Sequence, residues 1–129
     1  MKCLSIKGAQ NTPKVRLCAK KGLIEISGRS APRNSYEFYQ PIVDWLEEYS
    51  KAPKPKTSVN INFNFFDTGS SRCFIDVLLI LQNVHNINQG VEIKWYYDID
   101  DDEMLESGYD FESITRIPFK MIEVHHVNQ

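Results

Sequence analysis

The chain has 129 residues, 42% of them hydrophobic and 25% charged, with a formal net charge of -2 at pH 7. This length supports one domain with a sizeable core but not two ordinary domains, so we expect residues 1–129 to form a single domain. No apolar run is long enough to span a bilayer, and the N-terminal MKCLSIKGAQ lacks the apolar segment of a secretory signal. We therefore expect a cytoplasmic protein that does not insert into membranes.

The first predicted elements are a pair of strands and a helix. Residues 15–17 and 23–26 alternate apolar and polar side chains around a Lys-Lys-Gly sequence, which is typical of a β-hairpin. Asn34 can cap a helix, with a glutamate three positions on, and apolar residues then recur at helical spacing over residues 38–49. Pro41 has no N–H to donate, so it predicts a kink or the first residue of a second helix.

The second half of the chain alternates between strands and helices. Residues 57–66, TSVNINFNFF, place apolar side chains on one face and asparagines on the other, as a strand with one polar face does. Residues 70–88 form a dense apolar run too long for a strand, which predicts a mostly buried helix that ends near Gly90. The remaining predicted elements are a strand at VEIKWYY, a short acidic helix at MLESGYDFESI and a last strand at FKMIEVHHV. The order ββαβαβαβ predicts an α/β fold in which helices pack on a mixed β-sheet.

Charge is distributed unevenly along the chain. Residues 1–33 hold eight Lys or Arg and one acidic residue, Glu25, whereas residues 34–129 hold seven basic and sixteen acidic residues. A basic stretch can bind nucleic acid, but these basic residues fall where strand edges and a turn are expected, and folding can bring the acidic half beside them. We therefore predict no nucleic-acid partner.

The sequence also argues against a metal site or other cofactor. The cysteines form no CxxC pair and leave one unpaired in any disulfide scheme, so we expect free thiols at Cys3, Cys18 and Cys73. The acidic run from Asp98 has aspartates at the first, third and fifth positions of a calcium-binding EF-hand loop. It fails at two later positions, where Glu103 replaces the glycine and Tyr109 replaces the bidentate glutamate. This run is better explained as a solvated acidic loop or a charged patch that faces a partner.

The sequence Asp67-Thr68-Gly69-Ser70 reads like the catalytic loop of a pepsin-type aspartic protease. Such an enzyme needs two carboxylates that share a proton, so a chain with one such loop would have to dimerise. Those enzymes are all-β, whereas here the loop lies between a predicted strand and a predicted helix. A dimeric aspartic-type hydrolase that uses Asp67 is therefore the less favoured alternative.

A strand-to-helix turn gives the same residues a different chemistry. It places Thr68, Gly69, Ser70 and Ser71 at a helix N-terminus, where free backbone N–H groups and the positive end of the helix dipole stabilise an anion such as phosphate. Gly69 leaves the approach to Thr68 open, and Arg72 in the first turn can pair with a phosphoryl group. The alternative is that Thr68, Ser70 or Ser71 is only the N-cap of the helix, and spacing alone favours that alternative.

Several longer segments point to one family. They are TPKVRL, GLIEISGRS, YEFYQPIVDWLEEY, FNFFDTGSSRCFIDVL, WYYDIDDDEMLESGYDFE and PFKMIEV, which follow one another over nearly the whole chain. In these segments the sequence resembles the SiaC-type regulatory phosphoproteins, bacterial single-domain proteins with a fold like the STAS domains of anti-sigma-factor antagonists. The resemblance implies a STAS-like domain that acts in signal transduction by partner switching and is not an enzyme.

The resemblance also implies a phosphoacceptor and a set of protein partners. In the family, a serine/threonine kinase phosphorylates the threonine of the strand-to-helix loop, and a PP2C-like phosphatase removes the phosphate. The unphosphorylated form binds and activates a diguanylate cyclase, which makes cyclic di-GMP, a signal in biofilm formation. Thr68 matches that threonine, while Asp67 and Gly69 stand where the family commonly has Asn and Ser and would alter kinase choice or phosphate lifetime. An antagonist that binds an anti-sigma kinase instead of a cyclase would share the switch, and the sequence does not separate the two.

Overall fold

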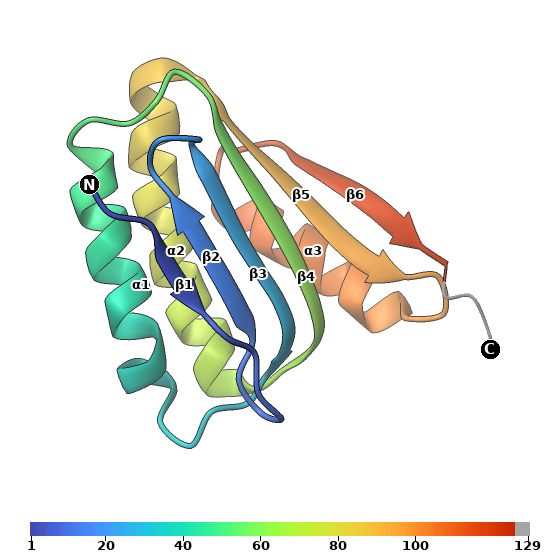
Figure 1. Cartoon of the computed structure of the whole chain (residues 1–129). Helices are drawn as coiled ribbons and strands as arrows, with labels where there is room; N and C mark the ends of the chain where they lie inside the picture. The colour runs from blue at the N-terminus through green and yellow to red at the C-terminus, as the bar shows by residue number, and fades with distance from the viewer. Residues whose placement is uncertain (126–129) are drawn as a thin grey trace.

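The computed structural model describes residues 1–125, which form a six-stranded sheet and three α-helices (Figure 1). The strands lie side by side in chain order, as β1 (Leu4–Ile6), β2 (Lys14–Cys18), β3 (Leu23–Ser30), β4 (Thr57–Phe66), β5 (Val91–Asp98) and β6 (Phe119–Val124). The helices are α1 (Ser35–Ser50), α2 (Thr68–Asn88) and α3 (Asp102–Ile114). β1, β2 and β3 pair antiparallel, and the pairs from β3 to β6 are parallel.

This architecture confirms the predicted α/β fold with helices packed on a mixed sheet. It adds β1, which pairs with β2 over Leu4 to Ile6 and which the predicted order did not contain. Of the two alternatives at Pro41, the start of a second helix is wrong, because α1 continues through that residue from Ser35 to Ser50. The predicted last strand ends at Val124 in the structure, and its positions 126 and 127 lie outside the described residues.

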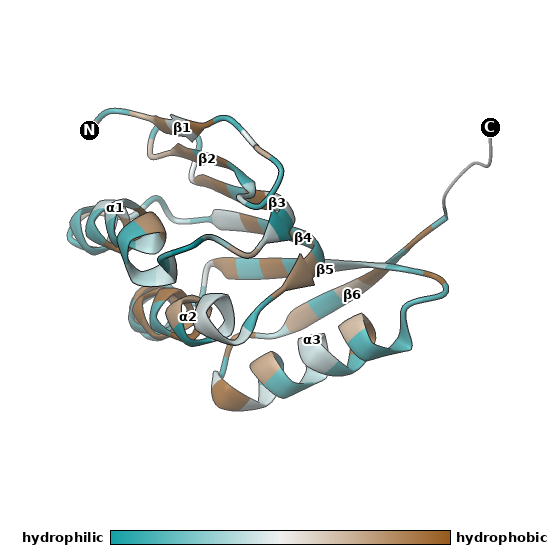
Figure 2. Ribbon diagram, turned by 90° about the horizontal axis from the view of Figure 1, so that it is seen from below, coloured by the Kyte–Doolittle hydropathy of each residue, from teal (hydrophilic) through white to brown (hydrophobic). Residues whose placement is uncertain are grey.

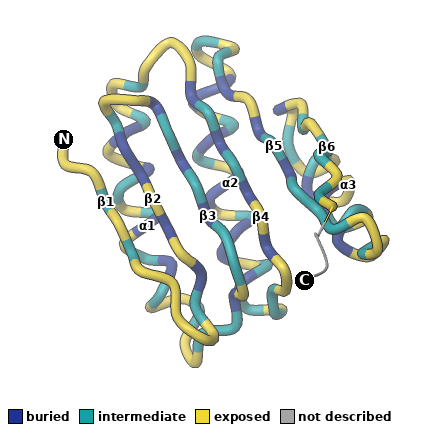
Figure 3. The backbone as a smooth tube through the Cα atoms, turned by 45° about the vertical axis from the view of Figure 1, so that its right-hand side comes forward, coloured by how far each residue is buried: buried dark blue, intermediate teal, exposed yellow. Residues whose placement is uncertain are grey.

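The helices lie on one face of the sheet and leave the other face open (Figure 2). β4 shows why: Val59, Ile61 and Phe63 point into the core and are at most 3% exposed, while the asparagines between them point away from it. Strands β2 and β3 alternate in the same way between buried and more exposed residues (Figure 3). An alternating strand that places its apolar residues under the helices therefore presents its polar residues to solvent.

The core joins the helices to the middle of the sheet through aromatic side chains. Trp95 of β5 is fully buried and packs against Phe63, Phe74 and Phe111, which come from β4, α2 and α3. The Trp95 indole N–H is satisfied by the carbonyl of Met104, at 2.9 Å. None of the described helices is both long and apolar enough to cross a membrane.

Candidate functional site

The candidate site lies where β4 ends and α2 begins. Asp67 is the residue between them, with an extended backbone, and its carboxylate Oδ1 accepts a hydrogen bond from the Ser70 N–H at 2.8 Å. This is the geometry of an N-cap. The prediction that Thr68, Ser70 or Ser71 caps the helix is therefore wrong, because Asp67 takes that position. Asp, Ser and Thr share the preference for the N-cap position, so the sequence held no signal that singled out Asp67.

Thr68 and Ser70, two of the hydroxyl residues that follow Asp67, have different environments. Thr68 is the first residue of α2 and is exposed to solvent, whereas Ser70 is only 1% exposed. The Ser70 N–H donates to the Asp67 side chain, and the Ser71 N–H donates to the Asp67 carbonyl at 3.0 Å. Within the described part of the chain, the backbone N–H groups at the start of α2 that have no hydrogen-bond partner are therefore those of Thr68 and Gly69.

Beneath the loop, three buried hydroxyl groups form a hydrogen-bonded chain. The Ser70 hydroxyl donates to the Ser30 carbonyl at 2.9 Å, and the Ser30 hydroxyl donates to Ser70 Oγ at 2.8 Å. Ser30 Oγ also lies 2.6 Å from the Tyr39 hydroxyl. Because each hydroxyl carries one proton, Tyr39 must be the donor to Ser30 in this arrangement. The chain ties the start of α2 to the end of β3 and to α1.

Burial raises the pKa of the Tyr39 hydroxyl to about 12, although its hydrogen bonds with Ser30 and Ser70 act in the opposite direction.

The Ser30 carbonyl accepts a second hydrogen bond, from the Asp67 N–H at 3.0 Å. The last residue of β3 therefore holds both the backbone of Asp67 and the side chain of Ser70. Ser70 supports the loop from below, and its hydroxyl is not available to a group that approaches from solvent.

The start of α1 lies against the start of α2, and this contact explains Gly69. A Cβ at Gly69 would come within 2.4 Å of the Ser35 Oγ and 3.1 Å of the Ser35 Cβ, closer than real Cβ atoms normally approach. Ser35 is the first residue of α1, and Asn34 caps that helix by accepting from the Glu37 N–H, as predicted. Two helix N-termini therefore meet beside Thr68, so the positive ends of two helix dipoles favour an anion there.

The other predicted site residues lie around this point. Ser71 is partly buried and lines a shallow pocket between α2 and α3, whereas Arg72 is exposed in the first turn of α2. Asp67, the candidate carboxylate of the hydrolase alternative, is engaged as a helix cap. In the acidic run, Asp101 caps α3 by accepting from the Met104 N–H at 3.0 Å.

The geometry brings a solvent-exposed threonine to a helix start that favours anions, on a fold in which that helix is anchored to the sheet by buried hydroxyls. An exposed hydroxyl at such a helix start is suitable for carrying a phosphate. The chain belongs to the SiaC family of regulatory phosphoproteins, whose sequence model matches residues 6–124. It is therefore a regulatory protein and not an enzyme, so the hydrolase alternative that uses Asp67 is wrong.

Individual relatives match the chain over nearly its whole length. An uncharacterized protein of Pseudomonas aeruginosa strain UCBPP-PA14 is 27% identical over 125 residues, which are 97% of this chain and 98% of the relative. The crystal structure of apo-SiaC from P. aeruginosa matches with a TM-score of 0.86 and 26% identity, over 95% of this chain and 99% of that one. A crystal structure of the diguanylate cyclase SiaD in complex with its activator SiaC, also from P. aeruginosa, contains a chain that matches with a TM-score of 0.88 and 26% identity, over 94% of this chain and 99% of that one.

Proposed function

We propose that this chain is a phosphorylation-controlled activator of a diguanylate cyclase, with Thr68 as the phosphoacceptor. The unphosphorylated protein binds and activates the cyclase in the cytoplasm. A serine/threonine kinase switches it off by phosphorylating Thr68, and a PP2C-like phosphatase restores it. The observation that carries the proposal is the exposed Thr68 at the start of α2, in a chain that is 26% identical to a solved cyclase activator.

The local electrostatics support a phosphate at this position. Phosphorylation adds about -1.5 to -2 charge and three acceptor oxygens. The free N–H groups at the start of α2, the neighbouring start of α1 and the exposed Arg72 all favour that charge, whereas the adjacent Asp67 carboxylate opposes it. The phosphate therefore fits the folded protein without a rearrangement of β4 or α2.

The same charge explains how binding is lost. A cyclase surface that packs against an uncharged Thr68 would have to desolvate a dianion once the threonine is phosphorylated. Where like charges face each other, such a change costs several kcal/mol, which corresponds to a loss of affinity of roughly a hundredfold or more. The switch then needs only a change of surface charge.

The first experiment locates the phosphate. The purified protein is incubated with host lysate and ATP, and intact mass and fragment analysis identify the modified residue in the wild type, in Thr68→Ala and in Ser71→Ala. Ser71→Ala is a matched control because it removes a neighbouring hydroxyl from the same helical turn. We expect one phosphate, absent only from Thr68→Ala; no phosphate, or a phosphate on another residue, contradicts the assignment of Thr68.

The second experiment tests the output. The unphosphorylated wild type and Thr68→Ala should both bind and activate the purified host cyclase, whereas the phosphorylated wild type should do neither. Binding of the phosphorylated form with unchanged affinity would contradict the switch. If the protein instead binds an anti-sigma kinase and has no effect on the cyclase, its partner is that kinase and the proposed cyclase partner is wrong.

A further inference from the structure

The N-terminal edge of the sheet brings two of the three cysteines of the chain together. The Cys3 thiol donates a hydrogen bond to the Cys18 sulfur, and the two Sγ atoms lie 2.7 Å apart. Both cysteines are free thiols in this structure. Because the S–S bond of a disulfide is about 2.05 Å long, the sulfurs would have to approach each other by less than about 1 Å for a bond to form.

Strand pairing explains why the two cysteines meet. β1 and β2 pair antiparallel with Leu4 opposite Leu17, and one step further in the same register sets Cys3 opposite Cys18. Directly opposite residues of an antiparallel pair have Cα atoms about 4.5–5.5 Å apart, which falls within the range of roughly 4.4–6.8 Å found in disulfides. A bond between the two sulfurs therefore needs no change of strand register.

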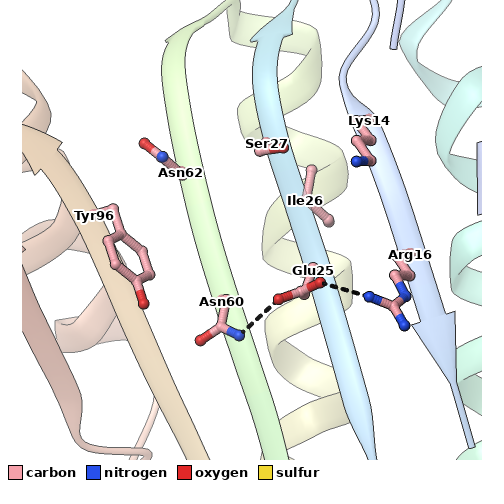
Figure 4. Close-up of a pocket in the computed structure, with 8 residues that line it drawn as sticks. All are labelled: Lys14, Arg16, Glu25, Ile26, Ser27, Asn60, Asn62 and Tyr96. Atoms are coloured by element: carbon pink, nitrogen blue, oxygen red, sulfur yellow. Dashed lines mark hydrogen bonds and ion pairs between the residues drawn. The ribbon is translucent and has the colours of Figure 1, made fainter. Parts of the chain in front are cut away.

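The surroundings of the pair favour the thiolate, which is the reactive form of cysteine. The hydrogen bond from Cys3 lowers the pKa of the Cys18 thiol, and the same bond raises the pKa of Cys3, its donor. The backbone N–H groups of Lys21 and Lys20 also lower the pKa of Cys18, although burial acts in the opposite direction. Positive charge on Lys21, and on Arg16 at the open face of β2 (Figure 4), further favours ionisation of the pair.

We propose that Cys3 and Cys18 form a reversible disulfide when the protein meets a low-molecular-weight disulfide such as oxidised glutathione. Cys3 is exposed, whereas Cys18 is only 7% exposed, so the sulfur of Cys3 attacks the oxidant and forms a mixed disulfide, which releases one glutathione. The Cys18 thiolate then attacks the Cys3 sulfur and releases the second glutathione. Two protein thiols and one oxidised glutathione thus become one protein disulfide and two glutathione thiols, which carry the two protons.

The new bond would fasten a short edge strand to the sheet. β1 has only three residues, and it pairs with β2 alone. The Trp45 indole N–H of α1 also holds this segment through the Lys2 carbonyl, at 2.9 Å. A disulfide at Cys3 lies between these two contacts, so it should suppress local opening of the strand.

The cysteine pair lies at the opposite end of the sheet from Thr68. Cys18 pairs with Leu23, which in turn pairs with Ser58 near the start of β4. Thr68 instead follows the end of β4 (Figure 1). The proposed disulfide is therefore independent of the proposed phosphorylation switch.

The test exposes the purified full-length protein to glutathione buffers with an increasing oxidised fraction, followed by thiol blocking and peptide mapping without reduction. We expect a cross-link between Cys3 and Cys18 and a loss of about 2 Da from the intact protein, both reversed by dithiothreitol. Cys3→Ser should form no such cross-link. Cys73→Ser is the matched control and should oxidise as the wild type does, because Cys73 is buried in α2 and its hydrogen bond is with Ser35.

Hydrogen exchange measures the effect of the bond on the strand. Oxidation should slow the exchange of the β1 backbone amides by about tenfold or more in the wild type and in Cys73→Ser. The same treatment should leave their exchange unchanged in Cys3→Ser. Unchanged exchange in the cross-linked wild type would refute the fastening of β1.

Three further results would overturn the proposal. The first is a protein in which Cys3 and Cys18 remain thiols in every buffer. The second is a stable glutathione adduct on Cys3, which would show that Cys18 does not resolve the mixed disulfide. The third is a cross-link that joins two copies of the chain instead of two residues of one copy, and the intact mass distinguishes these two cases.

Discussion

Asp67 offers a direct test of how the start of α2 is built. Its carboxylate caps the helix through the Ser70 N–H at 2.8 Å and also lies at the positive end of the helix dipole. Loss of an N-cap costs about 1 kcal/mol, within a range of roughly 0.5–2, and loss of a charge at the dipole costs about 0.3–1 kcal/mol. Asp67→Ala loses both, so we expect a decrease of roughly 2 kcal/mol in the free energy of unfolding. Asp67→Asn keeps an acceptor and loses only the charge, so it should cost well under half as much.

Urea unfolding followed by circular dichroism measures both variants. The decrease for Asp67→Asn should shrink further in high salt, because salt screens the interaction between the carboxylate and the helix dipole. Under the proposed function, Asp67→Asn should also activate the cyclase as well as the wild type does. An asparagine variant as unstable as the alanine variant would refute the capping argument, and a stable asparagine variant that no longer activates the cyclase would give Asp67 a role beyond the cap.

Two further predictions concern the contacts around the loop. Because the pKa of Tyr39 is raised to about 12 in the folded protein from an ordinary value of 10, its contribution to stability is complete below pH 10 and is lost as pH rises toward 12. Tyr39→Phe should therefore have a free energy of unfolding about 1 kcal/mol lower than that of the wild type at pH 8. Near pH 11, where the raised pKa has cost the wild type about 1.4 kcal/mol, the order should reverse and the variant should be more stable by about 0.4 kcal/mol; a difference in urea unfolding that does not change with pH would refute this. Gly69→Ala should lower the free energy of unfolding by about 1–2 kcal/mol, because the added Cβ clashes with Ser35. The decrease should be much smaller in a Ser35→Ala background. Strictly additive effects of the two substitutions in a double-mutant cycle would refute the contact.

The sequence predicted most elements because their periodicity is set by burial. The alternation in β4 and the dense apolar run of α2 identify both, and Asn34 followed by Glu37 marks the start of α1. β1 was missed because three residues are too few to show a period. These are local patterns, and they fail where an element is short.

The helix start at Thr68 was predicted from the sequence, but the contacts around it were not. The strand-to-helix turn correctly placed Thr68 at a helix start, but a sequence cannot distinguish among adjacent residues that all favour caps. Asp67 was considered as a catalytic carboxylate, and its role as a cap emerged only from its contact with Ser70. The chain of hydroxyls joins residues that are 40 positions apart, so it has no local signature in the sequence.

The fold separates the roles of adjacent hydroxyls by burial. A phosphate on Ser70 would have to break the hydrogen bonds with Ser30 and place a dianion among buried groups, whereas a phosphate on Thr68 stays in solvent. Burial alone therefore protects Ser70, so a kinase that phosphorylates Thr68 does not need to recognise the loop sequence in order to avoid Ser70. It follows that phosphorylation should leave the backbone amide shifts of Ser30 and Tyr39 nearly unchanged, since the anchoring network lies beneath the modified residue and keeps its partners.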